Sequence, residues 1–359
     1  MFTERTSVGL DVHARSVVAA AIDTVTGEVV TVRLGCADDE VIGWVARLAG
    51  PAAVTYEAGP TGFGLARAFE AAGIRCVVAA PSKLVRPAGD RVKTDAKDAL
   101  LLARLLRMDE IVPVRVPTVA EEAARDLARA REDARGDLMA ARHRLSKLLL
   151  RHGHVYAGGR AWTVVHDQWL RRIRFDQPGT QAAFDSYYAD VVFTVARRDQ
   201  LDQQIRTMAA DSEFTSTISR LCCLRGIDVL TGFGLVVEIG DWARFDPASI
   251  GAYLGLTPGE ASSGEKRVLT SITKAGNTHA RRLLVEAAWH HKPSYRPGNT
   301  LLRRWNQAPG PVVARAHQAN KRLHQRWLDF DARHKRPVIA NVAVARELAG
   351  WCHTLATMT

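Results

Sequence analysis

The sequence predicts two architectures in one chain, a mixed α/β region at the N-terminus and all-α regions after it. Residues 6–35 hold three short runs of apolar and β-branched residues, and residues 52–107 alternate strand-like with helical runs. Residues 119–152 are rich in Ala, Arg, Glu and Leu, with no Pro and one Gly. A chain of 359 residues can form two or three domains. The predicted boundaries are 1–115, 116–212 and 213–359.

The N-terminal region is expected to contain three strands followed by alternating helices and strands. The strands are expected at 6–12, 16–23, 28–35, 52–59 and 74–80, and the helices at about 38–49, 63–73 and 93–107. The TVTG tetrapeptide between the second and third runs is typical of a hairpin turn. An antiparallel meander followed by alternating units is the order of a ribonuclease H-like domain, although other α/β domains share it.

The middle region is expected to be a long α-hairpin or coiled coil. Leucines at 127, 138, 145 and 149 recur at helical intervals, and a second helical stretch covers about 182–210. A plain spacer is the alternative, but an amphipathic hairpin commonly pairs with another copy to cover its apolar surface.

The C-terminal region is expected to be mainly helical and to contain a helix-hairpin-helix. The run LRGIDVLTGFGLVVEIGD (224–241) has a Gly-containing turn before an apolar helix. Backbone N–H groups in such a turn, together with Arg225, could bind a phosphate, or the turn could be purely structural.

The charge of the chain favours a polyanionic partner. Lys and Arg number 49 against 38 Asp and Glu, a formal net charge of +11, and most of these cations are arginine. Arginine suits phosphate, so nucleic acid is the simplest partner, although an arginine-rich coding bias would give the same composition. The five cysteines form no C-x-x-C pair, which favours reduced thiols and a cytoplasmic protein. No apolar run is long enough to predict a membrane span or a signal peptide.

Four acidic residues are candidates for a metal site. Asp11 lies in an apolar strand, where a carboxylate is costly without a partner, and Glu57 ends the strand expected beside it near one edge of the sheet. Asp95 and Asp98 share one face of the 93–107 helix. Such a cluster of like charges needs cations, and oxygen ligands suit Mg²⁺ or Mn²⁺. Each acid alone could equally be solvated surface.

The segment EASSGEKRVLTSITKAGNTHARRLL (260–284) places a serine pair, Ser262 and Ser263, before a run of basic residues. The serines could form a turn, cap a helix or act as a nucleophile. Asn277 is a plausible N-cap for the helix that follows. Lysines and arginines from two segments are candidate phosphate ligands, although all could be solvated: Lys93, Lys97, Lys266, Arg267, Lys274, Arg281 and Arg282.

Several stretches of this sequence resemble a known family, the insertion-sequence transposases with a RuvC-like DEDD domain. The N-terminal stretches are GLDVH, YEAGPTG and RVKTDAKDALLLARLLR; the C-terminal ones are LRGIDVLTGFGLVVEIGDWARF, YLGLTPGEASSGEKR, ITKAGNTHARRLLVEAAW and VAVARELAGW. The motifs keep the order of the family and cover nearly the whole chain.

The resemblance implies a recombinase that excises and inserts a mobile element, guided by a structured bridge RNA that pairs with target and donor DNA. It implies that the acids bind Mg²⁺ and that a serine becomes joined to a DNA phosphate. It also implies a tetramer assembled from dimers, in which the RuvC-like domain of one subunit meets the serine domain of another. The acidic positions match Asp11, Glu57, Asp95 and Asp98.

The matching serine is Ser263, because the family's serine directly precedes a glycine; Ser262 is the alternative. The family usually has a second glycine where this chain has Glu265. The loop around the serines holds no histidine to serve as a base, because His279 is sixteen residues on in the expected helix; this favours activation by the metal site. Resealing through the serine link needs no nucleotide cofactor, and no P-loop is present. Two further hypotheses remain: a structure-selective DNA nuclease that uses the acids alone, and a non-catalytic nucleic-acid-binding relic.

Overall fold

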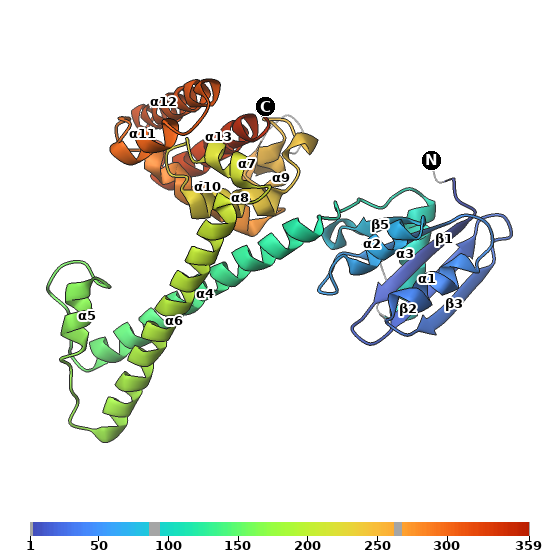
Figure 1. The fold of residues 1–359 in the computed structure, drawn as a ribbon, viewed down its shortest axis with the longest axis horizontal. Coiled ribbons are helices and arrows are strands. Elements are labelled where there is room, and N and C mark those ends of the chain that lie inside the picture. Colours follow the sequence, from blue (N-terminus) through green and yellow to red (C-terminus); the bar gives the residue numbers. More distant parts are fainter. Residues whose placement is uncertain (1–2, 86–93, 262–267, 359) are drawn as a thin grey trace. The chain divides into compact units, whose positions relative to one another are not determined.

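The computed structural model describes residues 3–85, 94–261 and 268–358. The chain forms two compact units, Met1–Thr118 and Val119–Thr359, and each is described by itself. The predicted mixed α/β N-terminal region and the mainly helical remainder are confirmed (Figure 1). The finer division at 115 and 212 stays a prediction.

A five-stranded mixed sheet forms the centre of the first unit, in the order β3-β2-β1-β4-β5. Its strands are β1 (Thr6–Val12), β2 (Val17–Asp23), β3 (Val29–Leu34), β4 (Ala52–Glu57) and β5 (Arg75–Ala79). The first three strands pair antiparallel as a meander, whereas β4 pairs parallel with both β1 and β5. The backbone N–H of Gly27, at φ 76°, closes the predicted hairpin turn onto the carbonyl of Asp23.

Helices cover both faces of this sheet. They are α1 (Asp38–Ala46), α2 (Gly64–Ala71) and α3 (Asp95–Arg107), with a short 3₁₀ turn η1 (Pro81–Lys83). Residues of α1 and α2 pack with Val8, Leu10 and Val54 on one face. Alternate residues of a strand point to opposite faces, so Gly9 and Asp11 face the other side, where α3 lies.

The contact between β1 and α3 is close because glycine meets alanines there. A Cβ at Gly9 would lie 2.0 Å from the carbonyl oxygen of Ala99 and 2.5 Å from the backbone nitrogen of Ala103. Both alanines are fully buried. No side chain fits at position 9 unless the helix moves away from the strand.

Two long antiparallel helices begin the second unit, α4 (Val119–Arg151) and α6 (Pro178–Ala210). Ion pairs between them follow the antiparallel register, since Arg131 pairs with Asp202, Arg197 with Asp137, and Arg144 with Asp190. The predicted α-hairpin is present, and α6 begins earlier than expected because Pro178 suits the first turn. A short helix not predicted from the sequence, α5 (Val164–Leu170), lies at its turn (Figure 1).

The remaining helices pack around a large apolar core that includes Leu323, Trp327 and Leu348. They are α7 (Thr215–Leu221), α8 (Val229–Ile239), α9 (Ile250–Tyr253), α10 (Thr278–Ala288), α11 (Asn299–Trp305), α12 (Gly310–Ala332) and α13 (Pro337–Ala356), with 3₁₀ turns η2 (Trp242–Arg244) and η3 (Trp289–His291). The strands β6 (Pro258–Glu260) and β7 (Leu269–Ile272) pair antiparallel. Among the described residues, none of the helices has the length and apolar character that crossing a bilayer requires.

We expect Gly9→Ala to lower the free energy of unfolding of the first unit by about 1–3 kcal/mol, because the added methyl group meets the α3 backbone. Differential scanning calorimetry of the full chain would measure the loss. Gly64→Ala is the matched control, since a Cβ at Gly64 meets no atom within 4 Å. Equal melting temperatures of the two variants would contradict a tight contact between β1 and α3.

Candidate active site

Asp11 lies near the carboxyl end of β1, the central strand of the sheet, on the face covered by α3. Its side chain is 23% exposed. The neighbouring strand β4 runs parallel, and its Tyr56 pairs with Leu10. One residue further along both strands stand Asp11 and Glu57. The register therefore places Asp11 and Glu57 side by side, as expected. They lie at the carboxyl ends of two interior strands, and not on an edge strand of the sheet.

Two further acids come from the first turn of α3. Thr94 caps this helix, its hydroxyl accepting a hydrogen bond from the backbone N–H of Lys97 at 3.3 Å. Asp95 and Asp98 follow it, where the helix dipole favours negative charge. Arg33 on β3 donates a hydrogen bond to Asp95 at 3.1 Å, which ties the helix start to the sheet. Lys97 belongs to the same turn, whereas Lys93 lies outside the described residues.

Three side chains gather where β1 meets the start of α3. The Nε2 atom of His13 lies 3.2 Å from Oδ2 of Asp11 and 3.8 Å from Oδ1 of Asp95. One potential ligand atom from each of the three lies within 4.8 Å of the others. Carboxylate oxygen with imidazole nitrogen is a donor set that binds divalent metals. These residues therefore fit a metal ion.

The direction of the pKa shift of Asp11 agrees with a site that binds a cation. Burial raises the pKa of Asp11, the nearby Asp95 and Asp98 raise it further, and His13 opposes them. Asp98 is thus close enough to act on Asp11 through its charge. The described residues leave Asp11 incompletely compensated, which is typical of functional sites.

His13 was not among the residues that sequence reasoning selected. It stands two positions after Asp11 in GLDVH, a spacing that keeps side chains on one face of an extended chain. That spacing is the signal that could have identified it.

The serine pair and two of the candidate phosphate ligands, Ser262, Ser263, Lys266 and Arg267, lie outside the described residues. By chain order they fall between β6 and β7. After β7 the chain turns through Lys274 and Gly276, both at positive φ. Asn277 then caps α10 as predicted, since its side chain accepts a hydrogen bond from the backbone N–H of Ala280 at 2.9 Å.

Three of the candidate arginines support the fold through hydrogen bonds. Arg281 donates to the carbonyls of Leu254 and Ala275, at 3.0 and 2.7 Å. Arg225 donates to the carbonyls of Pro293 and Ser294, at 3.0 and 3.1 Å. Arg282 pairs with Glu286 at 2.7 Å and with Glu132. Any phosphate contact by these arginines would use the remaining N–H groups.

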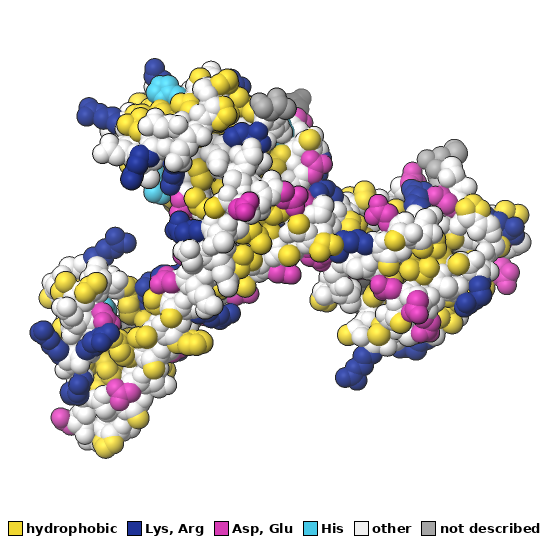
Figure 2. All heavy atoms as spheres, viewed as in Figure 1, with side chains coloured by type: hydrophobic (Ala, Val, Ile, Leu, Met, Phe, Trp, Pro, Cys, Tyr) yellow, Lys and Arg dark blue, Asp and Glu magenta, His cyan; other side chains and the backbone are white. Residues whose placement is uncertain are grey.

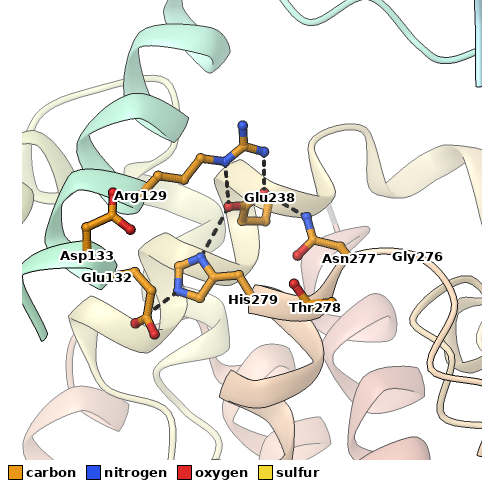
Figure 3. Close-up of a pocket in the computed structure, with 8 residues that line it drawn as sticks. All are labelled: Arg129, Glu132, Asp133, Glu238, Gly276, Asn277, Thr278 and His279. Carbon is orange, nitrogen blue, oxygen red and sulfur yellow. Dashed lines mark hydrogen bonds and ion pairs between the residues drawn. The ribbon is translucent and has the colours of Figure 1, made fainter. Parts of the chain in front are cut away.

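A pocket of about 370 Å³ opens beside the turn before α10 (Figure 3). Its lining residues come from α4, α8 and the start of α10: Arg129, Glu132, Asp133, Glu238, Gly276, Asn277, Thr278 and His279. The only one of them that sequence reasoning had considered structurally important was Asn277. Acids outnumber the single arginine, so the lining does not suit an anion.

Glu238 joins the three elements of this pocket. Arg129 donates to its two carboxylate oxygens at 3.1 and 3.0 Å, Asn277 donates at 2.7 Å, and His279 Nδ1 lies 3.2 Å away (Figure 3). Burial alone would raise the pKa of Glu238, but these partners together lower it to about 2. An acid inside the apolar run LTGFGLVVEIGD was the sequence signal for this residue.

We expect Glu238→Gln to lower the unfolding free energy of the second unit at pH 7 by on the order of 3 kcal/mol, because it leaves Arg129 without its buried partner. The pKa of Glu238 is depressed to about 2, so its contribution is complete above pH 4.5 and is lost as the pH falls toward 2. Urea unfolding at a series of pH values would measure both effects.

Glu286→Gln is the control for this variant, because Glu286 lies on α10 in the same unit, and its side chain is 58% exposed. An exposed pair contributes at most about 1 kcal/mol. A Glu238→Gln protein as stable as this control would refute the structural role of the buried carboxylate.

We expect Asp11→Asn to stabilise the first unit in the presence of EDTA. Because the pKa of Asp11 is raised, its ionisation opposes folding above the ordinary pKa of 3.8, and removing the charge lifts that cost at pH 7. The melting temperature should rise by on the order of 1–3 °C in calorimetry. Added Mg²⁺ should raise the melting temperature of the unmodified protein and not that of the variant.

Asp23→Asn provides a control of opposite sign. Asp23 is paired with Arg5 at 2.9 Å, and its pKa is lowered to about 2, chiefly by that hydrogen bond. This variant should therefore melt earlier than the unmodified protein. A fall in melting temperature for Asp11→Asn in EDTA would mean that Asp11 is a structural residue.

Comparison with known proteins places both halves of the chain in one family. A family model described as "Transposase IS116/IS110/IS902 family" matches residues 218–300, and a second, for DEDD transposases and described as "Transposase", matches residues 8–153.

Relatives agree with these matches over most of the chain. A protein of Sinorhizobium fredii that carries the name transposase y4qE is 39% identical over 302 residues, which cover 84% of this chain and 74% of the relative. The "Transposase for insertion sequence element IS1533" of Leptospira borgpetersenii is 32% identical over 78% of this chain and 82% of its own length. The chain therefore belongs to the IS116/IS110/IS902 family of transposases, enzymes that transfer phosphoryl groups on DNA.

Proposed function

We propose that this transposase moves its element by metal-dependent strand cleavage through a covalent phosphoserine–DNA intermediate. The observation that carries the proposal is the convergence of Asp11, His13 and Asp95, with Asp98 one helical turn further and Glu57 beside Asp11 by register. A cluster of acids from two strands and one helix is costly unless cations bind it. The resemblance of the serine segment to the family's motif supplies the second half of the proposal.

Asp11, Glu57, Asp95 and Asp98 would hold Mg²⁺ or Mn²⁺, with the imidazole of His13 within reach. Such ions, when bound, stabilise the charge on the attacking and leaving oxygens of a phosphodiester. The chain's own residues fix the geometry: Arg33 holds Asp95, and the Thr94 cap holds the first turn of α3.

The proposed nucleophile is Ser263, with Ser262 as the alternative. Its hydroxyl oxygen would form a bond to phosphorus while the bond from phosphorus to one bridging oxygen of the DNA breaks. The serine proton passes to solvent, and the released DNA oxygen takes up a proton to become a hydroxyl end. The phosphoester count is unchanged, so the reverse attack by a DNA hydroxyl reseals the strand without a nucleotide cofactor.

Basic residues would contact the DNA or RNA phosphates around both halves of the site. In the first unit these are Lys93 and Lys97. In the second they are Lys266, Arg267 and Lys274, with the remaining N–H groups of Arg225, Arg281 and Arg282. The family resemblance further supports guidance by a structured bridge RNA and assembly of dimers into a tetramer, with acids and serine supplied by different subunits.

We expect the purified protein, incubated with element ends, the flanking transcript and Mg²⁺, to form a protein–DNA adduct that survives denaturant. Ser263→Ala should abolish the adduct and Ser262→Ala should leave it. Asp11→Ala should lower its yield by at least about 100-fold, as expected when a metal ligand is lost. Omission of the transcript tests RNA guidance separately.

Mixing the two inactive variants, Asp11→Ala and Ser263→Ala, tests the shared site. If acids and serine come from different subunits, mixed oligomers regain adduct formation, whereas neither variant alone does. Free DNA ends without an adduct would favour the structure-selective nuclease. Binding without any cleavage would favour the non-catalytic relic.

A further inference from the structure

The turn of the α4/α6 hairpin carries an unusual share of the positive charge of the chain. Residues 141–177 contain eight Lys and Arg against two acids, a net charge of +6, out of +11 for all 359 residues. The rest of the hairpin differs, because residues 119–140 hold four cations and six acids, and residues 178–210 hold three cations and four acids. Cations are thus concentrated at the turn.

Five of the seven cations in residues 119–140 and 178–210 form ion pairs, whereas half of the cations in residues 141–177 have no partner among the described residues. Within residues 141–177, Arg144 pairs with Asp190 at 2.6 Å and Arg171 with Asp167 at 2.8 Å. Arg174 donates to backbone carbonyls, and Arg142 stacks 4.9 Å over the ring of Trp162. The other four are exposed, and no partner for them is found in residues 3–85, 94–261 and 268–358: Lys147, Arg151, Arg160 and Arg172.

The turn is a packed structure that holds these cations in place. Leu170 and Ile173 are buried against α4 and α6. The buried imidazole of His166 meets the rings of Tyr156, Trp162 and Trp169 at centroid distances of 4.7, 5.0 and 5.4 Å. Such an aromatic cluster fixes both α5 and the chain before it.

A hydrogen bond also connects α5 to the hairpin, while the basic side chains of this region remain exposed. The hydroxyl of Tyr188 on α6 donates to Asp167 at 2.7 Å, which occupies one of the two acids of the segment. Figure 2 shows dark-blue side chains gathered over this end of the hairpin, at the lower left of the view. The four exposed cations, which have no partner among the described residues, therefore make this packed end of the hairpin a positively charged surface.

We infer that this surface, defined by Lys147, Arg151, Arg160 and Arg172, binds the phosphate backbone of duplex DNA. Cations that neutralise phosphates release the counterions condensed on a polyanion, which favours binding. Duplex DNA is the favoured occupant because the family acts on DNA and because a set of cations contacts phosphates without reading bases. The inference extends the proposed function but needs neither the serine nor the metal.

The test uses the full-length protein with the four residues changed to Gln together. In EDTA, which prevents metal-dependent cleavage, we expect its affinity for a 40-base-pair duplex to fall by about 10- to 1,000-fold. The slope of log K against log salt concentration should become shallower by up to about 3.6, which corresponds to four phosphate contacts. Fluorescence anisotropy at several salt concentrations measures both.

A matched variant removes the same charge elsewhere in the second unit, through Gln at Arg206, Arg303, Lys335 and Arg336. Equal losses in the two variants would overturn the assignment, since total charge alone would explain them. So would a loss confined to structured RNA, or an altered oligomeric state with duplex binding unchanged. Unchanged melting temperatures show that the variants are folded, and the readout stays valid even if adduct formation fails.

Discussion

The absence of a side chain at Gly9 is the constraint on which the N-terminal site depends. Only a glycine lets the backbone of α3 approach β1 this closely, with Ala99 and Ala103 completing the contact. The first turn of the same helix carries Asp95 and Asp98, and the same strand carries Asp11 two residues after the glycine. The free energy of packing at this apolar interface therefore holds the carboxylates close together, although their like charges repel one another.

The buried Glu238 of the second unit and the half-buried Asp11 of the first differ in how their charges are compensated. Glu238 accepts hydrogen bonds from Arg129 and Asn277 and contacts His279, and its pKa falls to about 2. Asp11 has one imidazole and two acidic neighbours, and its pKa rises. The first acid is satisfied and joins helices, whereas the second retains capacity for a cation. Burial acts to raise the pKa of both acids, so it does not distinguish their roles. The net direction of the pKa shift does, because it is upward for Asp11 and downward for Glu238.

Local patterns in the sequence identified most of the framework. The strand runs, the TVTG turn, the helix predicted over 93–107 and the Asn277 cap depend on neighbours in the chain, and the structure has all of them, with the helix at Asp95–Arg107. The short elements α5, β6 and β7 were missed because three to seven residues carry too little periodicity. His13 and Glu238 each left a local signal, a two-residue spacing after Asp11 and an acid in an apolar run, but both were missed because their roles depend on partners from other elements. Ser263 was selected by motif alone and lies outside the described residues.

The regular pairing along the hairpin gives it a definite reach. A helix of 33 residues at 1.5 Å per residue extends about 50 Å, and ion pairs at three levels hold α4 and α6 in register along this length. At 3.4 Å per base pair, that distance corresponds to roughly 15 base pairs of duplex. The base of the hairpin packs into the helical core up to Ala128, which leaves about 35 Å of α4 between the core and Arg151. A duplex bound at the turn would therefore lie roughly one helical turn of DNA away from that core, and lengthening or shortening both helices by whole turns would change this distance.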